Sequence, residues 1–355
     1  MNFLRSIMMG SALVASLAVA ALPGDAAAEK VIKLGHLNND DPFENPAGAF
    51  GRVFANLVES ATNGGIKVEI FPNGQLGKDF EIAQQVRDGV IQMSLASVGG
   101  LASHYPKIGV IDVAFAFPHI SAVYDVFDGP FGKALARDIE MDVPEVKVLG
   151  YADTGGFFSI SNSKHPVASL EDLEGLRIRT MTLESHQTLI NALGAEAYPL
   201  AWAEVYSGLQ TGVIDGQMNP VPIIAFSNFE EVQQYLTLTE HLFTPYTVLI
   251  NKDFYDGLSD QEKYIVNYAA KSGVVASRGI ARAIEASDRG LPKLAQKMEI
   301  TALSVEDREK FRAAAQPAVI ELIKSKYGAR GEELLNLFLA EIDKAGQDEY
   351  MQSAP

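Results

Sequence analysis

The 355-residue sequence contains no cysteine. This absence excludes disulfide bonds, thiol nucleophiles and cysteine-ligated metal sites, and it also excludes the lipidated cysteine of bacterial lipoproteins. After residue 28, no apolar run reaches the roughly 20 residues that a membrane-spanning helix needs. The sequence therefore predicts an unanchored mature protein without disulfides or thiol chemistry.

Positive charge is also scarce. The chain has 29 Lys and Arg against 45 Asp and Glu, which gives a formal net charge of −16 and a sequence pI of about 4.8. Such a charge argues against nucleic acid or an anionic membrane surface as a direct partner. Hydrophobic residues make up 47% and charged residues 21%, as in an ordinary globular protein with a full core. The length allows two domains or one large domain.

Residues 1–28 have the pattern of an export signal. Arg5 lies in a short basic region, residues 6–22 form an apolar stretch, and Ala26 and Ala28 form an A-x-A cleavage site before Glu29. An uncleaved anchor is the alternative. Cleavage near Ala28 predicts a protein of the bacterial periplasm.

In the mature chain, short apolar runs typical of strands alternate with amphipathic segments typical of helices. This order predicts an α/β protein with parallel-rich sheets covered by helices. The predicted strands are 31–37, 66–72, 90–98, 146–152, 176–180 and 213–220, and the predicted helices are 45–65, 79–89, 121–140, 183–193, 203–212, 307–328 and 330–346.

Motifs of common enzymes are missing from the mature chain. It has no G-x-x-x-x-G-K-[ST] phosphate loop, no H-E-x-x-H and no G-x-S-x-G. The six histidines are scattered, and no two lie at i,i+2 or i,i+4 spacing, whereas metal-binding histidines usually occur in spaced sets. We therefore expect a protein that is not an enzyme and that holds no metal and no cofactor.

The segment "LRIRT", residues 176–180, places two arginines at the end of a predicted core strand. An unpaired buried guanidinium is costly. Arg177 and Arg179 therefore either reach solvent at a frayed strand end or meet an anion. We expect Thr182 to cap the following helix, so that Arg179 lies just before a helix N-terminus, where an anion is favoured. This position favours the anion.

Four stretches carry a family resemblance. They are "KVEIFPNGQLG" at 67–77, "EGLRIRT" at 174–180, "EVYSGLQTGVIDGQMNP" at 204–220 and "FEEVQQYLTLTEH" at 229–241. In order and spacing the chain resembles the solute-binding proteins of TRAP (tripartite ATP-independent periplasmic) transporters, of the C4-dicarboxylate-binding DctP type. The resemblance covers nearly the whole mature chain.

The resemblance implies a periplasmic receptor with a two-lobed α/β fold, the periplasmic-binding-protein (Venus-flytrap) fold, in which crossing strands and a long inter-lobe helix join the lobes. The implied boundaries are 29–154 plus 247–287 for lobe I and 155–246 plus 288–355 for lobe II. The lobes would close around a small organic acid, and the closed monomer would dock onto the small and large integral membrane components of a sodium-driven transporter.

The resemblance also implies site residues. Arg179 matches the arginine that pairs with a ligand carboxylate, and its planar fork suits that role. Asn219 matches an asparagine that touches the ligand. Trp202 falls where the family places an aromatic ring, with simple core packing as the alternative. Tyr246 and Thr182 are assigned to the same site. Arg177 stands at a variable basic position and is expected to be structural or to face solvent.

Three departures from the family pattern bear on the ligand. Phe158 stands where many relatives have a second arginine, Met218 stands where an acidic residue is common, and Ser97 stands where sialic-acid-type relatives have a glutamate. Asp79 either accepts hydrogen bonds from ligand hydroxyls or caps a helix. Loss of one cation favours a small monocarboxylate, aromatic or otherwise apolar beyond its acid group, over a C4-dicarboxylate or a sugar acid.

Three rival functions remain at this point. They are a receptor for an ATP-driven importer, a periplasmic enzyme, and a ligand-sensing subunit for a membrane kinase.

Overall fold

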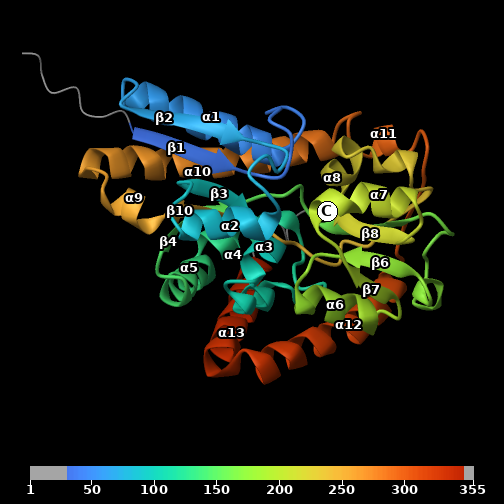
Figure 1. Cartoon of the computed structure of the whole chain (residues 1–355). Coiled ribbons are helices and arrows are strands. Elements are labelled where there is room, and N and C mark those ends of the chain that lie inside the picture. The colour runs from blue at the N-terminus through green and yellow to red at the C-terminus, as the bar shows by residue number, and fades with distance from the viewer. Residues whose placement is uncertain (1–29, 348–355) are drawn as a thin grey trace, which may run out of the picture.

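The computed structural model describes residues 30–347, so the predicted signal peptide lies outside the described residues. The chain forms two β-sheets, each with its own helices (Figure 1). We call the first sheet and the helices that cover it lobe I, and the second sheet with its helices lobe II. Within the described residues, no helix is both long enough and apolar enough to span a membrane.

The sheet of lobe I has five strands. They lie in the order β2 (Ile66–Phe71), β1 (Lys30–Gly35), β3 (Met93–Ala96), β10 (Tyr246–Asn251) and β4 (Val146–Ala152). Strand β1 pairs in parallel with β2 and β3, whereas β10 runs antiparallel to both of its neighbours.

The sheet of lobe II has six strands. They lie in the order β11 (Glu299–Ala302), β9 (Tyr235–Leu238), β5 (Phe158–Asn162), β8 (Gly216–Pro220), β6 (Arg177–Thr180) and β7 (Glu196–Pro199). Strand β6 is parallel to β7 and β8, and β5 is antiparallel to β8 and β9. The antiparallel strands β5 and β10 each directly follow a passage of the chain between the lobes.

Helices cover the sheets and connect the lobes. The two longest are α10 (Asp260–Glu285) and α12 (Val305–Lys326). The others are α1 (Pro46–Ala61), α2 (Asp79–Arg87), α3 (Val98–Ala102), α4 (Ile120–Asp128), α5 (Pro130–Asp142), α6 (Glu184–Ala192), α7 (Val205–Gln210), α8 (Val221–Phe226), α9 (Lys252–Asp256), α11 (Leu291–Leu294) and α13 (Gly328–Ala345), with 3-10 turns η1 (Pro106–Ile111), η2 (Glu171–Leu173), η3 (Trp202–Glu204) and η4 (Phe229–Glu231).

The predicted long inter-lobe helix is α10. It packs along α1 in lobe I and reaches α8 in lobe II, and Figure 1 shows it running behind both halves of the molecule. Near its end, Nη2 of Arg282 donates to the carbonyl of Gly155 at 3.1 Å, on the passage from β4 to β5. The last two helices also divide between the lobes, because α12 packs on α6 and α13 packs on α4 and α5. The exact lobe boundaries stay a prediction.

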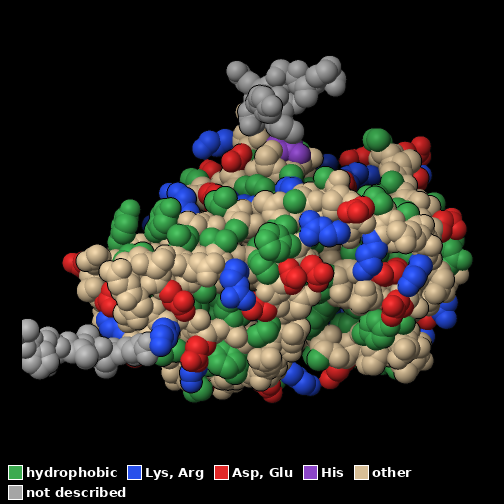
Figure 2. Space-filling view, turned by 90° about the horizontal axis from the view of Figure 1, so that it is seen from above, with side chains coloured by type: hydrophobic (Ala, Val, Ile, Leu, Met, Phe, Trp, Pro, Cys, Tyr) green, Lys and Arg blue, Asp and Glu red, His purple; other side chains and the backbone are tan. Residues whose placement is uncertain are grey.

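The hydrophobic core of lobe I lies on both faces of its sheet. On one face, the rings of Phe50 and Phe54 from α1 stack 5.8 Å apart and are buried together with Val266 of α10. Helices α2 to α5 cover the other face. Most charged side chains lie on the surface, and Figure 2 shows acidic and basic groups interspersed on the face seen from above.

One predicted helix is divided in the structure. The prediction of a single helix over 121–140 is wrong, because α4 ends at Asp128 and α5 begins at Pro130. Gly129 between them is extended, with φ −84° and ψ −160°. A residue before proline is driven out of the α-helical region, and the sequence signal for this break was the Gly-Pro pair.

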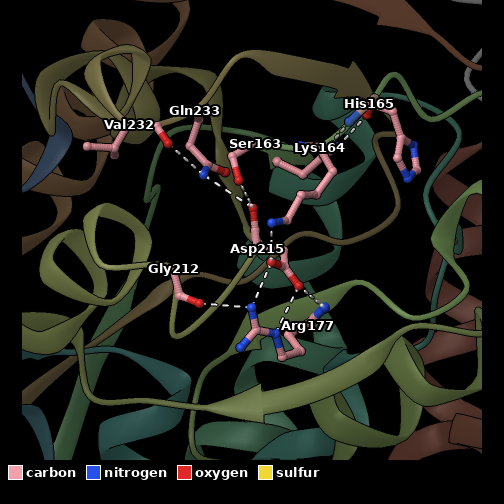
Figure 3. Close-up of polar contacts among 9 residues, drawn as sticks. Ser163, Lys164, His165, Arg177, Gly212, Asp215, Val232 and Gln233 are labelled. Carbon is pink, nitrogen blue, oxygen red and sulfur yellow. Dashed lines mark hydrogen bonds and ion pairs between the residues drawn. The ribbon is translucent and has the colours of Figure 1, made fainter.

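An ion pair between Arg177 and Asp215 connects the strands β6 and β8 (Figure 3). Its Nε and Nη2 donate to the two carboxylate oxygens of Asp215 at 2.9 and 2.8 Å, and Lys164 also pairs with this carboxylate at 3.2 Å. Asp215 is only 4% exposed, and the hydrogen bonds from Arg177 lower its pKa to about 2. The structural role expected for Arg177 agrees with these contacts, which join the starts of β6 and β8.

We expect Asp215→Asn to lower the free energy of unfolding at pH 7 by roughly 2 kcal/mol. The folded-state pKa lies below the unfolded one, so the stabilisation is complete above about pH 4 and disappears as the pH falls towards 2. Urea unfolding of both proteins at pH 7 and pH 3 measures the difference. Asp256→Asn on α9, whose exposed carboxylate pairs with Lys252, serves as a control with a much smaller effect. An equal loss at both pH values would contradict the assignment.

Candidate ligand-binding site

A cavity lies where the two lobes meet. Parallel strands present their carboxyl ends at one edge of a sheet, and here the ends of β1 and β3 in lobe I face those of β6 and β8 in lobe II. The side chains around the cavity are those of Leu37, Asn38, Asp79, Ser97, Thr154, Phe158, Arg179, Met181, Trp202, Asn219, Ile223 and Tyr246. Seven of the eight predicted site residues are therefore brought together.

Arg179 is a buried cation without an ion pair. Its side chain is 4% exposed, and its Nε and Nη2 both donate to the carbonyl of Leu200, at 3.0 and 2.8 Å. Among residues 30–347, no carboxylate lies within ion-pair distance of this guanidinium. Burial lowers the pKa of Arg179 to about 10, so it stays charged at neutral pH. The bond to Leu200 fixes its orientation and leaves Nη1 for a further acceptor.

Trp202 faces this cation. The Cζ of Arg179 lies 5.9 Å from the centre of the Trp202 ring, within the range of a cation–π contact. Trp202 begins η3 and remains partly exposed, and its ring also lies 5.9 Å from that of Phe229. Trp202 therefore combines packing in lobe II with a place in the cavity wall.

Asp79 and Ser97 lie on the lobe I side. The Ser97 hydroxyl donates to the carboxylate of Asp79 and accepts from the backbone N–H of Gly100 at 3.2 Å. Burial raises the pKa of Asp79, and the Ser97 hydrogen bond and the charge of Arg179 oppose this rise. The alternative that Asp79 caps a helix is wrong, because Asp79 is the first residue of α2 and Lys78 holds the capping position.

Asn219, Tyr246 and Phe158 also line the cavity. Asn219 of β8 is buried, and its Nδ2 donates to Oε1 of Gln217 at 2.5 Å. The hydroxyl of Tyr246 accepts from Nδ2 of Asn38 at 2.8 Å. Phe158 is fully buried, with the rings of His186 and His241 each 6.4 Å away. Burial lowers the pKa of His241 to about 3, so this histidine adds no positive charge behind Phe158 at neutral pH.

Thr182 does not belong to this cavity. Its side chain is exposed, and the helix after β6 begins at Glu184 with Leu183 in the capping position and no side-chain cap. The prediction that Thr182 caps this helix is wrong. Three residues, 181–183, separate Thr180 from the helix, and the Thr182 side chain lies in solvent.

Sequence reasoning missed five residues of the cavity wall: Leu37, Asn38, Thr154, Met181 and Ile223. Asn38 and Thr154 had a signal, because each is a polar residue within two positions of the end of a predicted strand. The three apolar residues had none, since an apolar side chain in an α/β protein is indistinguishable from core in the sequence.

We expect Thr182→Ala to change the free energy of unfolding by less than about 0.5 kcal/mol, because the side chain makes no capping bond. Ser304→Ala is the contrasting variant. The Ser304 hydroxyl accepts from the N–H of Asp307 at 3.0 Å as the cap of α12, and its loss should cost about 1 kcal/mol. Denaturant unfolding compares the two. Equal losses would show that Thr182 has a capping role after all.

Two lobes that enclose a cavity with a fixed, unpaired cation define a solute-binding receptor. Residues 40–326 match the family model of bacterial extracellular solute-binding proteins, family 7 (DctP). The chain belongs to this family, whose members bind solutes for TRAP systems and are not enzymes. Within residues 30–347, no cluster of three or more His, Asp or Glu is placed to hold a metal ion.

Individual relatives agree with this assignment. A solute-binding protein of Verminephrobacter eiseniae is 35% identical over 266 residues, which cover 74% of this chain and 77% of that protein. The C4-dicarboxylate-binding periplasmic protein DctP of Rhodobacter capsulatus is 32% identical over 326 residues, covering 90% and 93%. The crystal structure of the sugar acid binding protein DctPAm from Advenella mimigardefordensis with galactonate has a TM-score of 0.82 and 33% identity, covering 89% and 98%.

Proposed function

We propose that this protein is a periplasmic receptor that captures a small monocarboxylic acid and delivers it to the small and large membrane components of a sodium-driven TRAP transporter. The observation that carries the proposal is the buried, oriented guanidinium of Arg179, which has no carboxylate of its own protein to pair with. A ligand carboxylate compensates for this buried charge and forms the strong charge-assisted hydrogen bonds that a guanidinium favours.

The charges of the cavity wall favour a ligand with a single carboxylate. Arg179 is the one basic residue among those that line the cavity, and Asp79 adds an acidic group. Phe158 occupies the position of a second arginine, and His241, one of the two histidines next to it, is neutral at neutral pH. A second ligand carboxylate would be desolvated here without a second cation to pair with.

The other polar groups favour a hydroxylated acid. Asn38, Ser97, Asn219 and Tyr246 line the cavity together with Asp79, and such groups bind hydroxyls better than they bind a bare apolar chain. The expectation of an apolar acid therefore gives way here to a small hydroxy acid. DctPAm was crystallised with galactonate, which is a monocarboxylic acid with several hydroxyls. A C4-dicarboxylate, the ligand in the name of the Rhodobacter relative, is the runner-up.

We expect Arg179→Ala to weaken acid binding by 30-fold to a few thousand-fold, because truncating one partner of a buried charge pair costs about 2–5 kcal/mol. Arg179→Lys should lose nearly as much, since an ammonium cannot bind a carboxylate with two parallel hydrogen bonds. A thermal-shift screen of organic acids identifies binders, and calorimetry then measures affinities. Arg312→Ala, at an exposed site on α12, is the control. Binding by Arg179→Ala within threefold of wild type would refute the proposal.

Phe158→Arg should shift the preference from monocarboxylic towards dicarboxylic acids, because the new guanidinium supplies the missing second cation. Phe158→Leu removes the ring without adding charge and separates the two effects. Thermal melts of both variants test whether they remain folded. The measurement is the ratio of affinities for succinate and for erythronate. An unchanged ratio in folded Phe158→Arg would contradict the monocarboxylate preference.

A further inference from the structure

An ion pair joins the two lobes beside the ligand cavity. Nζ of Lys78 lies 3.2 Å from Oε1 of Glu204, and both side chains are 49% exposed. Lys78 precedes α2 in lobe I, and Glu204 closes η3 in lobe II. Among the ion pairs of residues 30–347, neither side chain has any other partner. This contact must break when the lobes separate.

The two residues of the ion pair lie next to two residues that line the ligand cavity. Lys78 is adjacent in sequence to Asp79, and Glu204 is two residues after Trp202. A second hollow, lined by Asn73, Lys78 and Glu81 among others, shares Leu37, Asp79 and Trp202 with the ligand cavity. The hollow is therefore part of the same cleft, and the ion pair lies at its edge, with Lys78 in its wall and Glu204 next to the lining residue Ala203. Closure that brings Trp202 towards Asp79 also brings Glu204 to Lys78.

We propose that Lys78 and Glu204 form a latch that holds the lobes closed over a captured acid, slows its release and favours acids short enough to end inside the ligand cavity. The inference rests on the proposed function. An acid enters while the lobes are apart and the pair is broken, so the pair acts on the release rate more than on the association rate. A longer acid that extends into the second hollow competes with the latch for the same space.

The size of the effect follows from the exposure of the pair. Exposed ion pairs contribute little free energy to stability. The range of their contributions corresponds to a change of about 1.5- to fivefold in a rate or equilibrium constant. Glu204→Gln is the cleaner single variant. Lys78→Met would also remove a positive charge from the hollow that Glu81 lines, which would disfavour an incoming anion. The exchanged variant Lys78→Glu with Glu204→Lys restores the pair in reverse.

Release kinetics test the latch. Trp202 is the one tryptophan of the chain and lies in the cavity wall, so its fluorescence reports binding directly in stopped-flow experiments. D-glycerate, D-erythronate and D-galactonate serve as probes of increasing length. We expect Glu204→Gln to release each bound acid about 1.5 to five times faster, the exchanged variant to restore the wild-type rate, and galactonate to gain affinity relative to glycerate. Salt at 1 M should speed release from wild type and leave Glu204→Gln unchanged, because salt screens exposed pairs.

A matched pair elsewhere provides the control. Lys252 and Asp256 form an ion pair within α9, with side chains 48% and 53% exposed, nearly the same as at the latch. Lys252→Met and Asp256→Asn should leave the release rates unchanged. An unchanged release rate in Glu204→Gln, or failure of the exchanged variant to restore it, would overturn the latch.

A measurement without acid keeps the test independent of the ligand. The chain has no cysteine, so spin labels can be placed cleanly at the exposed positions Val90→Cys in lobe I and Tyr198→Cys in lobe II. Glu204→Gln should shift the distance distribution towards longer distances, and an identical distribution would overturn the latch. Failure of wild type to bind any organic acid would instead count against the proposed function.

Discussion

The guanidinium of Arg179 is the group around which the cavity is organised. A buried cation is tolerated only when other groups compensate for its lost hydration. Here the carbonyl of Leu200 accepts two hydrogen bonds from it, and the ring of Trp202 lies over it. These groups orient the charge but do not neutralise it. Under the proposed function, the carboxylate of a bound acid supplies the rest of the compensation, and lobe closure and anion binding then become a single event.

The contrast with Arg177 shows how one strand carries a structural and a functional arginine. Residues two apart in a strand point to the same face, so both guanidinium groups emerge on one side of β6. Asp215 holds Arg177 with hydrogen bonds to both of its carboxylate oxygens, whereas no carboxylate pairs directly with Arg179 in the described residues. The stretch 204–220 therefore contributes both the partner that secures β6 and, at Asn219, part of the cavity wall.

Much of this arrangement could be predicted from the sequence. The alternation of strands and helices predicted the α/β class, and the family resemblance implied seven residues that the structure gathers in one cavity. Other features depend on contacts between distant segments. Thr182 has a good capping side chain, but α6 begins only at Glu184, with Leu183 in the capping position. The strand order of lobe I also depends on β10 entering between β3 and β4 from far along the chain, which no local pattern reveals.

The net charge of −16 affects how an anion would approach the buried site. The protein as a whole repels anions, but charges beyond about 8 Å are largely screened at physiological ionic strength. Acidic and basic side chains are also interspersed on the surface shown in Figure 2, which weakens any steering of an acid towards the cleft. Under the proposed function, selection therefore comes from contacts made after entry, at the guanidinium and at the polar groups of lobe I. Since those groups lie on opposite lobes, we expect affinity to depend on closure, and the proposed latch at the cleft would then alter how long an acid is held.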